Sequence, residues 1–182
     1  NRIKVFDNDG KGIIDALSLA YKKSSGELIT RMDSDDIMQL QKLELMHTDL
    51  QQNGKGNIAL GLVKYFSEEQ LGEGFSKYES WLNTLTKKGN NFFEIYKECV
   101  VPSPCWMVWR EDFDKCGGFN SDVYPEDYDL VFRFYRCGLK CLSSNNLLHL
   151  WRDYPTRTSR TDQHYADSSF IEIKTNYFLK LH

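Results

Sequence analysis

Long apolar runs are absent from this sequence, and so are the cysteine patterns of secreted or zinc-binding domains. No stretch approaches the ~20 apolar residues that a membrane-spanning helix needs, and no signal segment opens the chain. The cysteines number five, an odd count without a C-x-x-C pair. The spacing of Cys137, Cys141 and His149 matches no usual zinc site. These absences predict a soluble cytosolic protein with reduced thiols.

An excess of positive charge is also missing. The net charge is -3 and the pI is near 5.8, so the chain as a whole does not attract nucleic acid or anionic lipid. The sequence contains no Gly-rich phosphate loop, no internal repeat and no low-complexity segment. With 182 residues, of which 41% are apolar, it predicts one globular domain over residues 1–182.

Apolar spacing in the first part of the chain predicts alternating strands and helices. Ile3–Phe6 and Leu28–Met32 are typical of strands, and residues 13–21 have helical spacing. A second helix is expected to begin near Ile37 and to include residues 40–50, followed by a strand over Ile58–Phe66. This alternation favours an α/β fold with a mostly parallel sheet.

The second part of the chain continues the pattern less regularly. Helical spacing recurs at residues 78–85, 110–115 and 126–137, and a strand is expected over Cys105–Trp109. We also expect a strand pair over residues 139–142 and 147–151, and a final amphipathic helix from about His164.

The acidic run Asp33-Ser34-Asp35-Asp36 follows the strand that ends near Met32. Carboxylates packed this closely repel one another unless solvent, backbone N–H groups or a metal ion compensates. A structural explanation is that Asp35 or Asp36 caps the helix expected near Ile37. The run alone does not decide between a cap and a metal site.

Two further polar groups follow. Glu126 and Asp127 stand at a predicted helix N-terminus, where the helix dipole stabilises a carboxylate. The segment His149–Arg160 combines a histidine with three arginines and several hydroxyls. Arginines and hydroxyls of this kind suit a diphosphate.

Taken together, Met32–Asp36, Glu126–Asp129 and His149–Arg160 resemble the motifs of bacterial family 2 glycosyltransferases. The resemblance covers essentially the whole chain. It implies the GT-A fold, a Rossmann-like α/β fold with a mixed, mostly parallel sheet flanked by helices. It also implies inverting transfer of a sugar from a UDP- or GDP-linked nucleotide sugar to a hydroxyl acceptor, in the synthesis of a polysaccharide, glycan or glycolipid.

The resemblance implies roles for individual acidic residues. Asp33 matches the aspartate that faces the nucleotide ribose and the metal shell. Asp35 matches the aspartate that binds Mn²⁺ or Mg²⁺, and hard oxygen ligands suit both ions. Asp127, in the catalytic pair with Glu126, matches the general base that deprotonates the acceptor hydroxyl.

The third motif receives roles in the same way. His149 matches a position that completes the metal shell in some members, and Arg157 or Arg160 would hold the diphosphate from a closing loop. Structural roles remain open for all of them. His149 can be a packed core residue, and the arginines can pair with Asp153 and Asp162 on a solvated loop. We expect Trp106, Trp109 and Trp151 in the core, and Trp81 as a candidate platform for the acceptor.

Family members usually begin with a strand, turn and helix that grip the nucleotide, and this portion does not precede Ile3. We therefore expect an N-terminally truncated domain, with the rest of the donor and metal half in residues 1–66 and the acceptor half in 67–182. The expected partners are a nucleotide sugar and a glycan or lipid-linked acceptor, not nucleic acid. The expected location is the cytoplasm, including peripheral association of the parent enzyme with the inner face of the membrane.

Two other functions use the same residues. The main alternative is a non-catalytic fragment, or a glycan- or partner-binding module, of the same fold. A metal-dependent nucleotidyl or phosphoryl transferase would also need an acidic pair and arginines.

Overall fold

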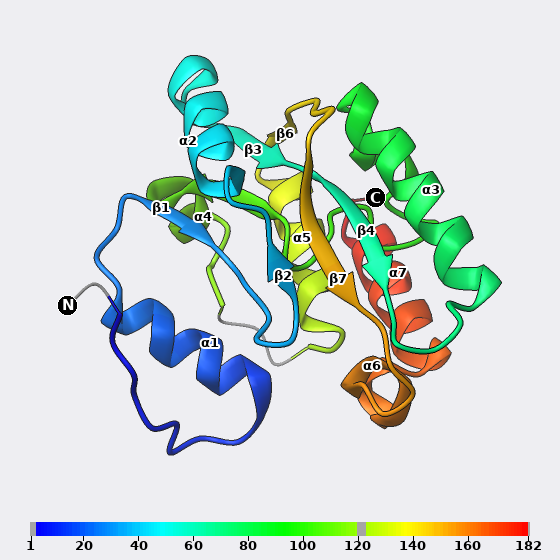
Figure 1. Ribbon diagram of the computed structural model, residues 1–182. Coiled ribbons are helices and arrows are strands. Elements are labelled where there is room, and N and C mark those ends of the chain that lie inside the picture. Colours follow the sequence, from blue (N-terminus) through cyan, green and yellow to red (C-terminus); the bar gives the residue numbers. More distant parts are fainter. Residues whose placement is uncertain (1–2, 120–122, 182) are drawn as a thin grey trace.

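Strands and helices alternate along the chain as the sequence predicts (Figure 1). The computed structural model describes residues 3–119 and 123–181. The helices are α1 (Gly12–Lys23), α2 (Lys42–Asn53), α3 (Glu73–Lys88), α4 (Arg110–Lys115), α5 (Glu126–Arg136), α6 (Thr158–Thr161) and α7 (Asp167–Leu181), with 3₁₀ turns η1 (Asn91–Glu94) and η2 (Gln163–Tyr165). The strands are β1 (Leu28–Thr30), β2 (Ile37–Met38), β3 (Asn57–Leu60), β4 (Leu62–Phe66), β5 (Trp106–Trp109), β6 (Lys140–Cys141) and β7 (Leu147–Arg152).

The segment Ile3–Phe6 is not a strand, so that prediction is wrong. Residues 3–9 have no regular secondary structure, and Ile3 and Val5 are 79% and 88% exposed. A strand needs a neighbour for its backbone N–H and C=O groups, and no strand of the described residues pairs with this segment. The apolar residues of this segment predicted a strand, but they could not show whether a partner strand lies beside it.

The acidic run does not cap a helix. Asp33–Asp36 forms a turn, in which the Asp36 N–H donates to the Asp33 carbonyl at 3.4 Å. The turn leads into strand β2, and helix α2 begins only at Lys42. The capping prediction is therefore wrong, because the Asp36 side chain turns away toward strand β7.

The predicted strand over Ile58–Phe66 is two strands divided at Gly61, and the two belong to different sheets. A Cβ atom at Gly61 would lie 2.7 Å from side-chain atoms of Leu148 in β7. Only glycine lets the backbones approach this closely. The close approach of β7 at Gly61 therefore divides an apolar run that looks continuous in the sequence.

The sheets are mixed rather than mostly parallel. One has the order β1-β5-β3-β6 and the other β2-β7-β4. Strands β1 and β3 both run antiparallel to β5 and are thus parallel to each other, as the alternation predicts. The antiparallel strand β5 lies between them, which alternation could not indicate. Strands β6 and β7, predicted as a pair, lie in different sheets.

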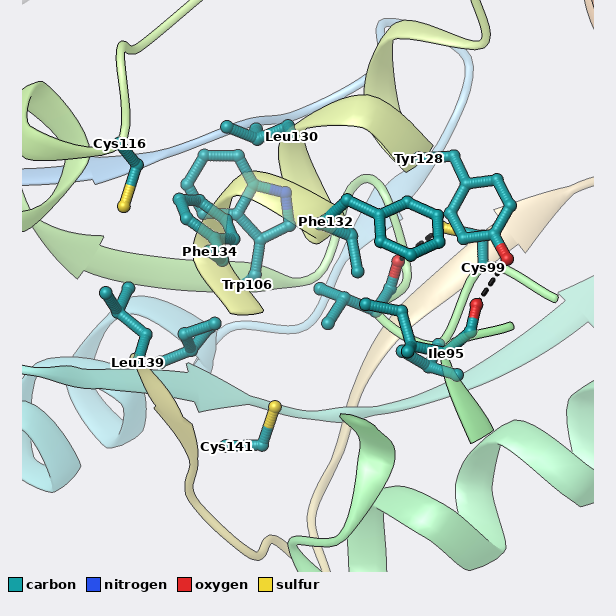
Figure 2. Close-up of a cluster of buried hydrophobic side chains, with 14 of the residues drawn as sticks. Ile95, Cys99, Trp106, Cys116, Tyr128, Leu130, Phe132, Phe134, Leu139 and Cys141 are labelled. Carbon is teal, nitrogen blue, oxygen red and sulfur yellow. Dashed lines mark hydrogen bonds between the residues drawn. The ribbon is translucent and has the colours of Figure 1, made fainter. Parts of the chain in front are cut away.

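Two hydrophobic clusters pack against the two faces of the β5 strand. Trp106 and Val108 face the first cluster, which is formed mainly with α5 and α7, whereas Met107 faces the second, formed with α2 and α3. Successive strand residues point to opposite faces, so one strand supplies both clusters. Figure 2 shows the first cluster, in which the Trp106 and Phe134 rings meet at a centroid distance of 5.6 Å. The middle of this sheet is thus buried on both sides.

The helices cover the sheets unequally. Helix α2 contacts β3 and β5, α3 contacts β4, and α5 contacts α7. Helix α1 has no buried residue and lies apart from the strands (Figure 1). Within the described residues, no helix has both the length and the apolar character needed to cross a bilayer.

Candidate active site

Three segments far apart in sequence line a cavity of about 720 Å³ beside the end of strand β1. The first is the acidic turn after β1. The second is the N-terminus of α5, with Glu126 and Asp127, and the third is the loop after β7, which includes Arg157. Because β1 and β5 are antiparallel, the loop that precedes β5 also reaches this end of β1 and brings Ser103 to the cavity. Side chains of α1 complete the lining.

Arg31 connects the acidic turn to helix α5. Ile29 and Arg31 project to the same side of the β1 segment, and Ile29 packs in the cluster shared with α5. The Arg31 guanidinium is therefore directed at the α5 N-terminus. Its Nε lies 2.9 Å from Asp33 Oδ1, and its Nη1 lies 3.1 Å from Glu126 Oε1. Burial alone would lower the pKa of Arg31, but Asp33 and Glu126 raise it, so both carboxylates have a fixed cation.

Glu126 is held on two sides. One carboxylate oxygen pairs with Arg31, and Oε2 accepts a hydrogen bond of 2.7 Å from the Tyr165 hydroxyl. The side chain is buried. Both oxygens of Glu126 thus have partners within the protein, which makes this carboxylate a poor candidate for direct proton transfer.

Asp127 is in a different environment, although it is the next residue. It lines the cavity, is half-buried, and accepts a hydrogen bond of 2.8 Å at Oδ1 from the Tyr128 N–H. Burial first, and then the neighbouring Glu126 charge, raise the pKa of the Asp127 carboxyl to about 7, while Arg31 opposes this shift. A carboxyl whose pKa is raised by burial and a neighbouring charge, and which lines a cavity, is a candidate for acid–base chemistry. Asp127 is the one suited to accept a proton near neutral pH.

Asp33 and Asp35 form the acidic end of the cavity. Asp33 is tied to Arg31 through one oxygen, and the Asp35 side chain hydrogen-bonds with Tyr154. Among the described residues, no group of three or more His, Cys, Asp and Glu could hold a metal ion by itself. Mg²⁺-type ions bound with a nucleotide take only one or two protein carboxylates, with phosphate and water as the other ligands. Asp33 and Asp35 fit that requirement.

The structure separates the two arginines proposed for the diphosphate. Arg157 lines the cavity, with its guanidinium 5.6 Å from the Trp151 ring centroid and Nη1 3.7 Å from Asp153 Oδ1. Arg160 does not line it. Its Nη2 lies 2.7 Å from Asp153 Oδ2, and its guanidinium lies 4.5 Å from the Phe75 ring centroid. Arg160 therefore anchors the loop, and Arg157 is left to face a ligand.

His149 lies outside the cavity lining, in contrast to its predicted position in a metal shell. The ring is fully buried, with Nε2 2.8 Å from Asp36 Oδ2 and Nδ1 3.3 Å from Lys42 Nζ. Both ring nitrogens have partners, so the imidazole has no free lone pair for an ion. The interpretation of His149 as a packed, hydrogen-bonded residue fits these contacts.

Arg152 holds the acidic turn from behind. Its backbone N–H donates to Asp36 Oδ1 at 2.7 Å, and its Nε donates to the Asp35 carbonyl at 2.8 Å. The alternative that Arg152 pairs with Asp153 or Asp162 is thus not what these contacts show; its carboxylate partner is Glu68, at 3.4 Å. Trp81, the expected acceptor platform, packs against the hydrophobic clusters and does not line the cavity.

Sequence reasoning missed several residues of the site. Arg31 could have been found from its spacing to Ile29, because residues two apart in an extended segment project to the same side. Ser103, Tyr154 and Tyr165 have no local signal, because strand pairing and loop packing bring them to the cavity. Trp151, expected in the core, is 9% exposed but also lines the cavity.

The structure is an α/β fold in which an acidic turn and an arginine-bearing loop line one cavity. Sequence comparison identifies the family of this domain. The family profile described as Glycosyl transferase family 2 matches residues 1–117, which include Asp33 and Asp35 and end before Glu126. The chain belongs to family 2 of the glycosyltransferases.

Curated relatives agree with the family. The O-antigen biosynthesis glycosyltransferase WbnJ of Escherichia coli is 32% identical over 137 residues, or 73% of this chain and 49% of that protein. An uncharacterized glycosyltransferase of Rickettsia bellii (strain RML369-C) is 30% identical over 152 residues, or 81% of this chain and 19% of that protein. Glycosyltransferase GlyG of Streptococcus pneumoniae serotype 4 is 21% identical over 170 residues, or 89% of this chain and 56% of that protein. The chain therefore spans 19% to 56% of the length of these relatives.

Proposed function

We propose that this domain catalyses inverting transfer of a sugar from a nucleotide sugar to a hydroxyl acceptor, with Asp127 as the general base. The observation that carries the proposal is the shared cavity. Its lining includes Asp33, Asp35 and Arg157, which suit a diphosphate and its cation, and also Asp127. Transfer to a neutral hydroxyl requires positive charge beside the departing diphosphate, which Arg157 and a bound cation would supply, and a base beside the hydroxyl, which Asp127 would supply.

The donor end would hold the nucleotide diphosphate. Arg157 offers a planar guanidinium for its oxygens, and Asp35, with the free oxygen of Asp33, would hold Mn²⁺ or Mg²⁺. The ion, when bound, supplies positive charge that stabilises the departing diphosphate. Arg31 holds Asp33 in position through the contact of 2.9 Å between its Nε and Asp33 Oδ1.

Asp127 would carry out the proton transfer at the acceptor end. As the acceptor oxygen forms its bond to the anomeric carbon, the bond from that carbon to the diphosphate oxygen breaks, and its electron pair leaves with the nucleoside diphosphate. The acceptor proton passes to Asp127. Attack from the face opposite the leaving group inverts the anomeric centre. A pKa near neutrality suits a base that must be ionised before the reaction and accept a proton during it.

The substrate classes follow from this chemistry and from the relatives. The proposed donor is a UDP- or GDP-linked sugar, and the proposed acceptor is a glycan or a lipid-linked glycan. The name of the Escherichia coli relative, which refers to O-antigen biosynthesis, supports a surface polysaccharide product. We retain the division into a donor half (1–66) and an acceptor half (67–182) as part of this proposal.

Calorimetry of the full-length enzyme with UDP-sugars and GDP-sugars, with and without Mn²⁺, tests the proposal. We expect binding that requires the ion and is lost in Asp35→Ala. Asp127→Asn should keep binding and lose transfer by roughly 10²- to 10⁴-fold, the usual contribution of a general base. Sugar binding that is independent of nucleotide, together with absence of turnover, would instead identify a non-catalytic glycan-binding module.

A further inference from the structure

The Ser103 hydroxyl is buried at the cavity without a hydrogen-bond partner. Ser103 is 5% exposed, and its Oγ makes no hydrogen bond with the residues that the structure describes. Other described side chains share this condition, namely Asn90, Asn91, Tyr96 and Trp109, but Ser103 alone among them lines the cavity. A buried polar group without a partner is destabilising, so a partner that the chain does not supply, such as a ligand hydroxyl, would stabilise Ser103 Oγ.

The backbone around Ser103 is restrained. The Cys105 N–H donates to the Pro102 carbonyl at 2.9 Å and closes a turn at the start of β5. Prolines on both sides have a fixed φ, and a residue before proline is itself restricted. The Pro104 carbonyl is held by the buried Lys42 ammonium. The hydroxyl is therefore presented by a rigid turn.

The polar neighbours of Ser103 leave only Asp127 available to a ligand. A second, much smaller cavity of about 10 Å³ is lined by Ser103 together with Arg31, Glu126 and Asp127. Arg31 and Glu126 pair with each other and with Asp33 and Tyr165, respectively. The groups that remain are the Asp127 carboxylate, which accepts hydrogen bonds, and the Ser103 hydroxyl, which can donate or accept them. This pair suits a neutral polyol better than an anion.

We propose that Ser103 hydrogen-bonds to a hydroxyl of the acceptor sugar that neighbours the hydroxyl deprotonated by Asp127, and so helps determine which acceptor is used. The inference rests on the proposed function. The same hydroxyl chemistry could come from the donor sugar, but the position of Ser103 favours the acceptor. Ser103 and Asp127 line both the large and the small cavity, whereas Asp33, Asp35 and Arg157 line only the large one.

The test compares wild type with Ser103→Ala in the full-length enzyme. The probes are the nucleotide sugar identified by calorimetry and methyl glycosides of glucose, galactose and N-acetylglucosamine with their monodeoxy analogues. Ser103→Ala should raise the acceptor KM by roughly tenfold, the value of one neutral hydrogen bond. The donor KM should not change, and with one deoxy acceptor wild type and variant should become equal. The thermal midpoint of Ser103→Ala should not fall, because the hydroxyl has no partner to lose.

Ser144→Ala is the matched control. Ser144 is also a buried serine, but it lies outside the cavity and its Oγ accepts a hydrogen bond from the Asn146 N–H. This variant should lose some stability and keep both KM values. An unchanged acceptor KM in Ser103→Ala would overturn the inference, and a raised donor KM in its place would overturn the assignment to the acceptor.

A readout without turnover separates this inference from the proposed function. Binding of the methyl glycosides to wild type and Ser103→Ala can be followed by saturation-transfer NMR. Glycoside binding that depends on Ser103 in a protein without transferase activity would support the sugar contact while rejecting the transfer reaction. Glycoside binding that is absent, or that does not depend on Ser103, would reject the contact in either case.

Discussion

His149 Nε2 lies 2.8 Å from Oδ2 of Asp36, the last carboxylate of the acidic turn. On the other side of the ring, Nδ1 lies 3.3 Å from Lys42 Nζ. The tautomer that carries its hydrogen on Nε2 donates to Asp36 and accepts from Lys42. A buried chain of hydrogen bonds therefore connects α2, β7 and the acidic turn, and it places the imidazole between a cation and an anion.

His149→Ala should be strongly destabilising. The change leaves the Lys42 ammonium and the Asp36 carboxylate buried without their shared partner, and breaking buried networks of this kind costs about 3–5 kcal/mol. Urea unfolding measures the loss. His47→Ala, on the exposed side of α2, should change the unfolding free energy by less than about 0.5 kcal/mol. A small effect of His149→Ala would mean that the network contributes little.

The rate of transfer should depend on the ionisation of Asp127. Since the pKa of Asp127 is raised to about 7, the base is protonated below that pH, and the rate should fall by about tenfold per pH unit there. Above pH 7 the rate should reach a plateau. The pH profile of kcat/KM for wild type checks this, and a profile flat between pH 5 and 8 would contradict it.

The same group should affect stability in the opposite direction. The folded-state pKa of Asp127 lies above the ordinary value, so its contribution is full below about pH 4 and is lost as pH rises through about 7. The asparagine of Asp127→Asn does not titrate. The free energy of unfolding of this variant, relative to that of wild type, should therefore rise by roughly 1–3 kcal/mol between pH 4 and pH 8. Urea unfolding at both pH values measures this difference, with the exposed Glu44→Gln as a control that should not show it.

Arg157 and Arg160 should differ in function. Arg157→Ala removes the cation that faces the cavity and should weaken UDP binding in the presence of Mn²⁺ by roughly tenfold or more. Arg160→Ala removes a partner of Asp153 and should lower stability by up to about 1 kcal/mol, with UDP affinity nearly unchanged. Calorimetry and thermal unfolding of the two variants make the comparison. Equal losses of UDP affinity would show that both arginines hold the diphosphate.

Arg31 should be essential for folding as well as for the site. Arg31→Met leaves Glu126 and Asp33 without their cation and should cost about 3–5 kcal/mol, the usual effect of breaking a buried ion pair. Arg31→Lys should cost less but should not restore both contacts, because one ammonium cannot reproduce the two directions of a guanidinium. Lys55→Met, which breaks the exposed pair with Glu111, is the control, with an expected change of at most about 1 kcal/mol.

Much of the fold follows from local pattern, and the failures have a common cause. Helical spacing indicated α1, α3, α4 and α5, and the acidic turn was expected at the end of β1. Gly61 divided an apolar run because Leu148, distant in sequence, crosses there. The antiparallel position of β5 also depends on distant partners. Periodicity reports which face of an element is apolar, but it does not identify the neighbouring element.

The site shows the same division. The resemblance to family 2 glycosyltransferases implied roles for Asp33, Asp35, Asp127 and either Arg157 or Arg160, and of these Arg160 alone does not line the cavity. His149 and Arg160 carry equally suitable chemistry, but Asp36 and Asp153 engage them elsewhere. Arg157 and Arg160 both pair with Asp153, so the place of each arginine along the loop, which residue type does not reveal, decides which of them lines the cavity.

Arg152 ties the loop that carries Arg157 to the acidic turn. The backbone N–H and the guanidinium of Arg152 both donate hydrogen bonds to the acidic turn, so the start of the loop is fixed to that turn. Arg157 can therefore change its distance from Asp35 only by bending the chain between Arg152 and Arg157. That segment reaches roughly 17 Å at full extension, at about 3.4 Å per residue. The length of this backbone segment therefore limits how far Arg157 can move relative to the acidic turn.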